Sequence, residues 1–153
     1  MDLQDFVKKY VWDDEKTPYF RGVTRLTKKQ ADNEIFVYAC FLTLIFISGE
    51  LVAISRWHKG GETAAILIAI YSSAVIAGAF SMWRGKTRWG ALLCLTAPIA
   101  AFLNFYFDGL QASLQNVDKY ALIIFSLLWL WYGVRTLKIV RHYPNMPEGK
   151  KPT

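Results

Sequence analysis

The chain has 153 residues and a formal net charge of +6, and 54% of its residues are apolar. Residues 63–83 and 89–107 contain no charged side chain. About 20 apolar residues cross a bilayer as a helix, whereas a buried helix of a water-soluble protein normally carries a polar stripe. The composition therefore argues against a soluble helical bundle.

Residues 1–33 form a charged arm that we expect to lie on the inner side of a membrane. Its first apolar residues recur with the spacing of one helix face: Leu3, Phe6, Val7, Tyr10 and Val11. This pattern predicts a short amphipathic helix in the membrane interface. Docking onto a partner subunit is the alternative, and the two can coexist. Thr27 and Gln30 match a capping box, so the first long helix should begin near Lys28.

Four apolar spans follow, at about residues 34–54, 63–83, 89–107 and 120–140. They predict an all-α integral membrane protein with a bundle of four transmembrane helices, in which short loops make consecutive spans antiparallel neighbours. The fourth span starts with only 15 uncharged residues. It would complete its crossing if Arg135 and Lys138 extend to the inner headgroups. Residues 141–153 are expected to form a flexible tail.

The positive charges predict the orientation of these spans. If both termini lie inside, 15 of the 18 Lys and Arg residues fall on the inner side. Positive charges close to span ends favour the inner side of a membrane. The basic side then faces anionic lipid, so we expect membrane lipids and other membrane subunits as partners and no nucleic acid. A bacterial inner membrane or its organellar equivalent is the expected location.

The second span carries a ridge of small residues spaced by four: Ala65, Ala69, Ser73, Ala77 and Ser81. Small residues let helix backbones approach closely in lipid. We expect this ridge to pack against the first or third span, with Val75 on another face. The alternative is a seam against another protein.

Glu50 is the only acid well inside a predicted span. Asn104 and Asp108, at the end of the third span, should reach a similar depth, so the three form a possible polar site. An intramembrane carboxylate is typical of a proton relay or a cation site. The interpretation that we favour is a structural pair with Arg56 or Asn104 near the outer interface.

The remaining reactive side chains predict no cofactor and no metal site. His58 and His142 lie near opposite faces of the membrane, so they cannot hold one haem together. No close spacing of His, Cys and carboxylates is typical of zinc. Cys40 and Cys94 lie at similar depths and could meet, although buried free cysteines usually act as small apolar residues.

Aromatic residues gather on the fourth span, where Trp129, Trp131 and Tyr132 lie nearer the bilayer middle than an interfacial belt would place them. They are candidates to line a groove for an apolar ligand such as a quinone, a pigment or an acyl chain. Contact with lipid or with a neighbouring subunit is the alternative.

No phosphate-binding loop or nucleophile elbow occurs, so the sequence predicts no enzyme. The favoured function is a non-catalytic accessory or assembly subunit of a larger membrane complex, in an energy-transducing membrane. The alternative is a small oligomeric transporter or channel that uses Glu50, Asn104 and Asp108. Pro98, which can free a backbone carbonyl inside the third span, favours that alternative.

Overall fold

The computed structural model describes residues 22–107 and 116–148. These residues form four long α-helices and two short 3-10 helices, without a strand: η1 (Val23–Arg25), α2 (Lys28–His58), α3 (Glu62–Gly85), α4 (Arg88–Phe107), α5 (Asn116–His142) and η2 (Tyr143–Asn145). The predicted amphipathic helix at the N-terminus, Asp108 and the end of the tail lie outside the described residues.

Three of the helical segments are long and apolar enough to cross a membrane, namely α2, α3 and residues Lys119–Asn145. Large apolar side chains are exposed on all of these helices, including Leu44 on α2 and Leu67 on α3 at 71% and 63%. Exposed apolar surface of this extent is typical of a protein surrounded by lipid. The all-helical class is confirmed, and the three helices are consistent with an integral membrane protein.

Helix α2 begins where the capping box predicts. The backbone N–H of Gln30 donates to the Thr27 side chain, and the N–H of Thr27 donates to the Gln30 side chain at 3.1 Å. This reciprocal pair satisfies two amide groups that would otherwise lack a partner at the helix start. The helix then runs without interruption to His58, and Gly60 forms the turn into α3 with a φ of +80°, which favours glycine.

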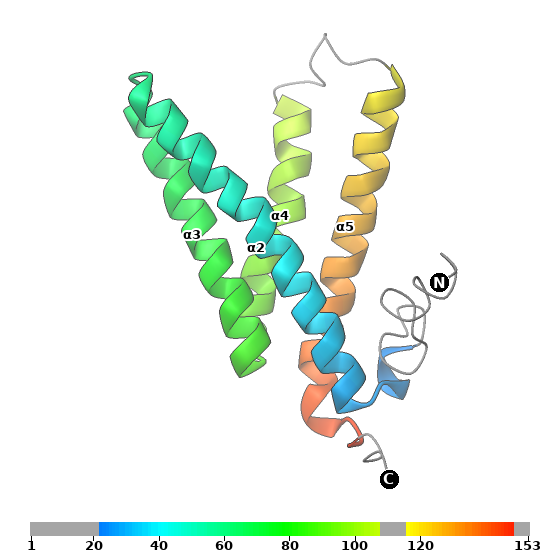
Figure 1. Cartoon of the computed structure of the whole chain (residues 1–153). Coiled ribbons are helices and arrows are strands. Elements are labelled where there is room, and N and C mark those ends of the chain that lie inside the picture. The colour runs from blue at the N-terminus through cyan, green and yellow to red at the C-terminus, as the bar shows by residue number, and fades with distance from the viewer. Residues whose placement is uncertain (1–21, 108–115, 149–153) are drawn as a thin grey trace, which may run out of the picture.

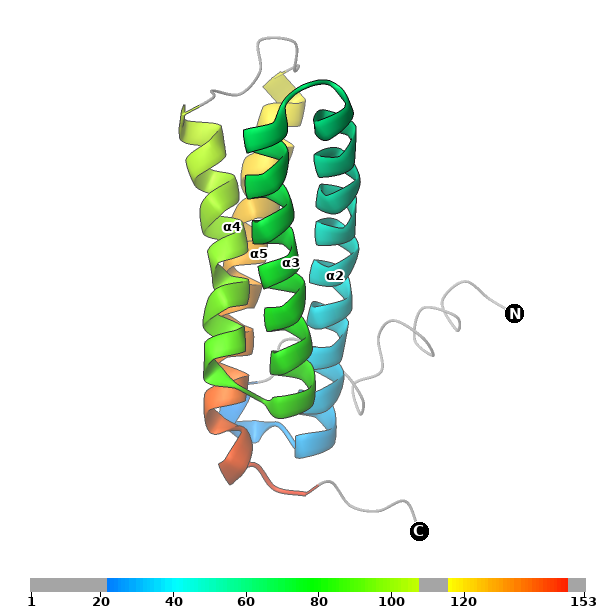
Figure 2. The same ribbon diagram turned by 90° about the vertical axis from the view of Figure 1, so that its left-hand side faces the viewer.

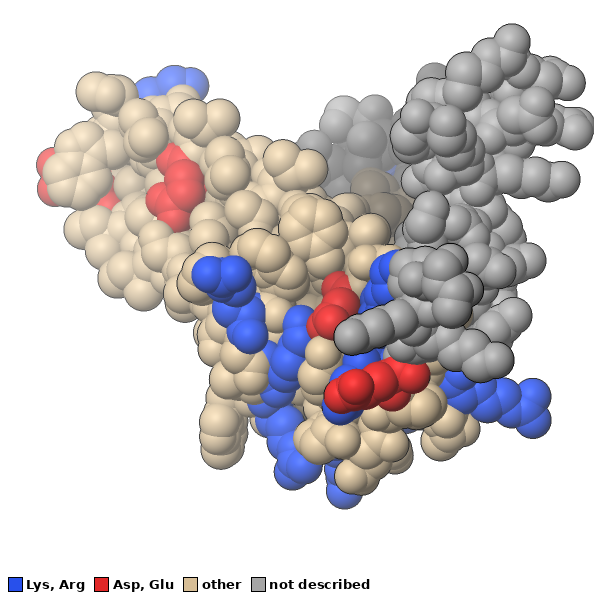
Figure 3. All heavy atoms as spheres, turned by 60° about the horizontal axis from the view of Figure 1, so that its bottom comes forward, with Lys and Arg blue, Asp and Glu red and all other residues tan. Residues whose placement is uncertain are grey.

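The helices form two hairpins, α2–α3 and α4–α5 (Figure 1). All four run lengthwise beside one another, with α3 next to both α2 and α4 (Figure 2). We call the end with the α3–α4 turn the basic end, because most Lys and Arg side chains gather there (Figure 3). The end with the α2–α3 turn is the far end. There the two hairpins diverge, as Figure 1 shows.

The buried core lies in the half of the bundle next to the basic end. Its members come from the start of α2, the end of α3, the start of α4 and the end of α5, with Ile35, Leu42, Met82, Cys94 and Ile139 all fully buried. Each helix thus contributes the part of its length that adjoins the basic end. The relative positions of the helices are therefore determined mainly at that end.

The small-residue ridge of α3 does not form the single packing seam that the sequence predicts. Ala65 is buried, but Ser73 and Ala77 are exposed, while Val75 is fully buried. The reason is geometric, because each step of four residues turns by about 40° around a helix with 3.6 residues per turn. The four steps from Ala65 to Ser81 therefore turn the ridge by about 160° around α3. The buried face consists instead of Ala65, Ser72, Val75, Gly78, Ala79 and Met82.

The backbones of α3 and α4 approach each other closely near the turn that joins them. A Cβ atom on Gly90 would lie 2.6 Å from the carbonyl oxygen of Gly78 and 2.9 Å from the backbone nitrogen of Met82. Thr87 caps the start of α4, where its hydroxyl accepts from the Gly90 N–H at 3.3 Å. The Ser81 hydroxyl lies 2.7 Å from the same oxygen. Small residues therefore do bring helices together here, but at this turn and not along a ridge.

We predict that Gly90→Ala destabilises the protein by about 2 kcal/mol, because the added methyl group meets backbone atoms that cannot rotate away. Thermal and denaturant unfolding in a mild detergent measure the change. Gly22→Ala is the matched control, since nothing lies within 4 Å of its added Cβ atom. Equal stability of the two variants would contradict the close α3–α4 contact.

Candidate functional site

A buried ion pair joins the first helix to the last. Arg135 of α5 donates through Nε and Nη2 to the two carboxylate oxygens of Glu34 on α2, at 2.9 Å each. Glu34 is 0% exposed and Arg135 is 8% exposed. Two parallel charge-assisted hydrogen bonds of this kind are among the strongest polar contacts in proteins, and they specify orientation as well as distance.

This pair corrects the expectation that Arg135 extends to the lipid headgroups. Its guanidinium turns into the bundle and binds Glu34, whereas Lys138, one turn further along α5, is exposed. The signal was available in the sequence, since Glu34 and Arg135 lie at the inner ends of two predicted spans. Ionisable residues inside membranes tend to pair with one another. Because both residues lie near the ends of apolar stretches, the sequence pattern alone did not indicate that they pair with each other.

Further contacts extend this connection at the basic end. Asp32 forms an ion pair with Lys86 at 2.8 Å and accepts a hydrogen bond from the Tyr143 hydroxyl at 3.0 Å. The Lys86 ammonium also lies 5.4 Å from the centre of the Tyr143 ring. The backbone N–H of Lys28 donates to the carbonyl of Pro147 at 3.0 Å. The first turns of α2 thus hold the end of α3 and the segment after α5 together.

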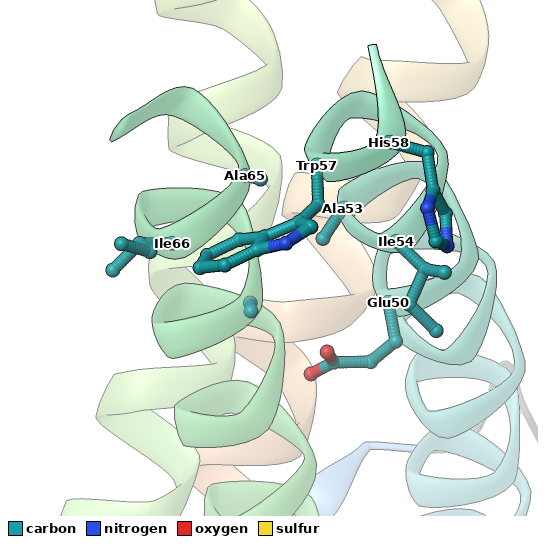
Figure 4. A pocket seen from close by; sticks show the side chains of 8 residues that line it. Glu50, Ala53, Ile54, Trp57, His58, Ala65 and Ile66 are labelled. Atoms are coloured by element: carbon teal, nitrogen blue, oxygen red, sulfur yellow. The ribbon is translucent and has the colours of Figure 1, made fainter. Parts of the chain in front are cut away.

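Glu50 lies in a pocket of about 260 Å³ between α2 and α3 at the far end (Figure 4). Its carboxylate points toward α3 and accepts a hydrogen bond from the Ser73 hydroxyl at 2.8 Å. The Trp57 ring lies across the space between the two helices, and the His58 ring points to the other side of α2 (Figure 4). The lining of the pocket is mainly apolar, and its polar members are Glu50 and His58.

Among the described side chains, the partner of Glu50 differs from the Arg56 that we expected. It is Ser73 and not Arg56, because the side chain of residue 50 turns toward the adjacent helix of its own hairpin. The side chain of Asn104 and all of Asp108 lie outside the described part of the structure. Grouping of these three residues into one polar site therefore stays a prediction. Helix α4 continues without a break through Pro98.

Four aromatic residues of α5 line one groove of about 350 Å³ between α2 and α5. The three candidates lie there with neighbours from both helices: Val37, Tyr38, Phe41, Phe125, Leu128, Trp129, Trp131 and Tyr132. The Phe41 and Trp129 rings pack edge to face with centres 5.7 Å apart, and the Tyr38 and Tyr132 rings do the same at 5.3 Å. Whether an apolar ligand binds in this groove stays a prediction.

A larger groove of about 400 Å³ lies on the face formed by α2 and α3. Small side chains form its floor, including Ala39, Cys40 and Thr43, and the Thr43 hydroxyl is satisfied by the carbonyl of Ala39 at 2.8 Å. Phe36, Phe80 and Trp83 form an aromatic wall, in which ring centres are 5.4 and 5.9 Å apart. Sequence reasoning missed this groove because its two sides come from different helices.

The two cysteines occupy different environments. Cys94 is fully buried in the core, and Cys40 is exposed in the α2–α3 groove. Both are free thiols, so the packing interpretation describes Cys94 but not Cys40. Within residues 22–107 and 116–148, no group of three or more His, Cys, Asp and Glu residues is placed to hold a metal ion.

The chain matches no protein-family model, no curated protein and no solved structure.

We predict that Glu34→Gln and Arg135→Gln each lower the free energy of unfolding by about 3–5 kcal/mol, because each leaves one buried charge without its partner. The double variant should lose less than the sum, with a coupling of about 2 kcal/mol. Unfolding in detergent of all three variants measures this cycle.

Lys28→Gln is the control for the cycle. Lys28 pairs with Glu148 at 3.4 Å, and the Glu148 side chain is 87% exposed. Removing a surface pair should cost less than about 1 kcal/mol. Additive losses from Glu34→Gln and Arg135→Gln would show that the two side chains do not stabilise each other.

For Glu50 we predict that replacement by Gln leaves the fold intact and the stability almost unchanged. The Gln side chain keeps an oxygen that accepts from Ser73 and removes only the charge. Ion flux through vesicles that contain the purified protein is the decisive measurement, with Ser73→Ala as the control for loss of the hydrogen bond alone. A flux that is present in the natural protein and absent in folded Glu50→Gln would establish the transporter alternative.

Proposed function

We propose that the chain is a non-catalytic accessory subunit of a larger membrane complex, and that it binds a helix of its partner in the α2–α3 groove. The observation that carries this proposal is the composition of that groove. Its floor of small residues allows a close approach of another backbone, which is how helices associate in lipid. The exposed aromatic wall adds contact area at one end.

The exposed part of the small-residue ridge also supports a partner interface on the face that carries the α2–α3 groove. Ala77 is exposed on α3, one turn away from Phe80 and next to Ile76, which both line the groove. A seam against another protein was one of the two interpretations of the ridge. The burial pattern favours it for this part of α3, since a small residue without a neighbour in its own chain is open to a partner.

The polar contacts support a structural role. In the described spans, Glu34 binds Arg135 and Glu50 accepts from Ser73, so both acidic side chains have partners within the chain. A transporter needs polar groups that can exchange one partner for another as an ion passes. Paired carboxylates near opposite ends of α2 are better suited to positioning helices.

We further propose that α4 is a fourth crossing and that both termini lie on the inner side of a bacterial inner membrane or its organellar equivalent. Helix α4 runs alongside α3 (Figure 2), and its 20 residues correspond to about 30 Å of helix, the thickness of the hydrocarbon core. The gathering of Lys and Arg at the basic end supports the inner position of that end (Figure 3).

Cys40 provides a natural probe of the proposed interface, because it lines the groove and Cys94 is fully buried. We predict that a thiol-directed photocrosslinker on Cys40, activated in native membranes, yields one discrete adduct with another polypeptide. Thr43→Leu, which fills the groove, and Ala77→Leu, which adds a larger side chain on α3 beside Ile76 of the groove, should abolish that adduct. The products are identified by mass spectrometry.

The matched control moves the probe to a different exposed position. Ile124 of α5 is 57% exposed, so Ile124→Cys in a Cys40→Ala chain presents a thiol to the bilayer away from the groove. Identical products from the two positions, or products with lipid alone, would contradict a protein interface at the α2–α3 groove. A product with a second copy of the chain would favour an oligomer.

A further inference from the structure

The groove between α2 and α5 continues toward the basic end into a smaller pocket. That pocket has a volume of about 220 Å³ and is lined by Gly22, Val23, Trp131, Val134, Arg135 and Lys138. Trp131 lines both spaces, so the two adjoin along one side of α5. Together they extend from Phe125 to Lys138, which is about 20 Å along a helix that rises about 1.5 Å per residue.

The pocket ends at unpaired positive charge. Lys138 is exposed and forms no ion pair with any acid in the described residues, in contrast to Lys28, Lys86 and Arg135. Arg141, three residues further along α5, is likewise exposed without an acidic partner in that part of the chain. A cation at this position has no counterion among the described residues, so a negative group from outside can bind it.

The floor of this long groove differs from the floor of the α2–α3 groove. It consists of large rings, among them Tyr38, Phe41 and Trp129, and not of small residues. Large rings hold a partner helix away from the backbone, whereas a flexible chain can lie along them. Val37, Leu128 and Trp131 are 42%, 60% and 51% exposed, so the groove opens to the surrounding bilayer.

We propose that this groove binds an anionic glycerophospholipid, with its phosphate beside Lys138 and one acyl chain along α5 toward Phe125. The groove is about 20 Å long, and one leaflet of the hydrocarbon core is about 15 Å thick, so an acyl chain fits its length. Trp131 lies where the groove meets the pocket, so one side chain borders both the path of the acyl chain and the approach to Lys138. This proposal is independent of the interface on the α2–α3 face.

The test uses the full chain in phosphatidylcholine vesicles with a photoactivatable phosphatidylglycerol whose reactive group is on the acyl chain. Adducts are mapped by mass spectrometry, and unlabelled phosphatidylglycerol and phosphatidylcholine compete with the probe. We expect adducts on the groove residues of α5, with phosphatidylglycerol competing more strongly. Lys138→Gln should reduce this preference about fivefold, equivalent to ~1 kcal/mol at about 1.4 kcal/mol per tenfold change.

Two variants make the result specific. Arg88→Gln removes an exposed charge from the α3–α4 turn at the same end and should leave the preference unchanged. Lys138→Arg keeps the charge and should retain the preference. An equal loss in Lys138→Gln and Arg88→Gln would show a general surface charge effect and overturn the site. Equal competition by the two lipids would overturn it as well.

A crosslinking experiment distinguishes a bound lipid from residues 1–21 of the same chain as the occupant of the groove. Leu128→Cys in a Cys40→Ala chain places a thiol-directed photocrosslinker in the groove, since Leu128 is 60% exposed. Adducts with lipid are the expected products. Crosslinks to residues 1–21 in place of lipid would assign the groove to that segment and overturn the proposal.

Discussion

The buried pair of Glu34 and Arg135 is the contact on which the rest of the structure depends. The two residues are 101 positions apart in sequence, and their side chains meet inside a bundle whose outer surface is apolar. In lipid a charge without a partner is costly, so α2 and α5 must hold the rotation and depth at which the pair forms. This requirement sets the position of the first helix against the last.

The asymmetry of the bundle follows from that position. Asp32, Lys86 and Tyr143 add polar contacts around the same end, and the buried core lies beside them. At the far end α2 and α3 contact each other, but the hairpins diverge (Figure 1). Helix α2 has α3 as one neighbour and α5 as another, and a groove lies between α2 and each of them. One has a floor of small residues and the other a floor of aromatic rings, which suits them to different occupants.

Local patterns predicted the helices well. The apolar spans at residues 34–54, 63–83, 89–107 and 120–140 lie within α2, α3, α4 and α5. The capping box at Thr27 gave the start of α2 because both of its hydrogen bonds lie within one turn. The prediction of a packing seam along the small residues of α3 was wrong for the opposite reason. Which of these residues are buried depends on how α3 is rotated against its two neighbours. Spacing by four residues does not state that rotation.

The amino-acid sequence by itself determined the helical class, the positions of the four apolar spans, the start of α2 and the apolar surface that lipid requires. These properties depend on composition and on contacts between residues a few positions apart. Only the tertiary structure decided that Arg135 turns inward to Glu34, that Glu50 meets Ser73 and that Cys40 is exposed while Cys94 is buried. Each of these outcomes depends on the crossing angle and rotation of a helix relative to another, which packing of side chains sets collectively.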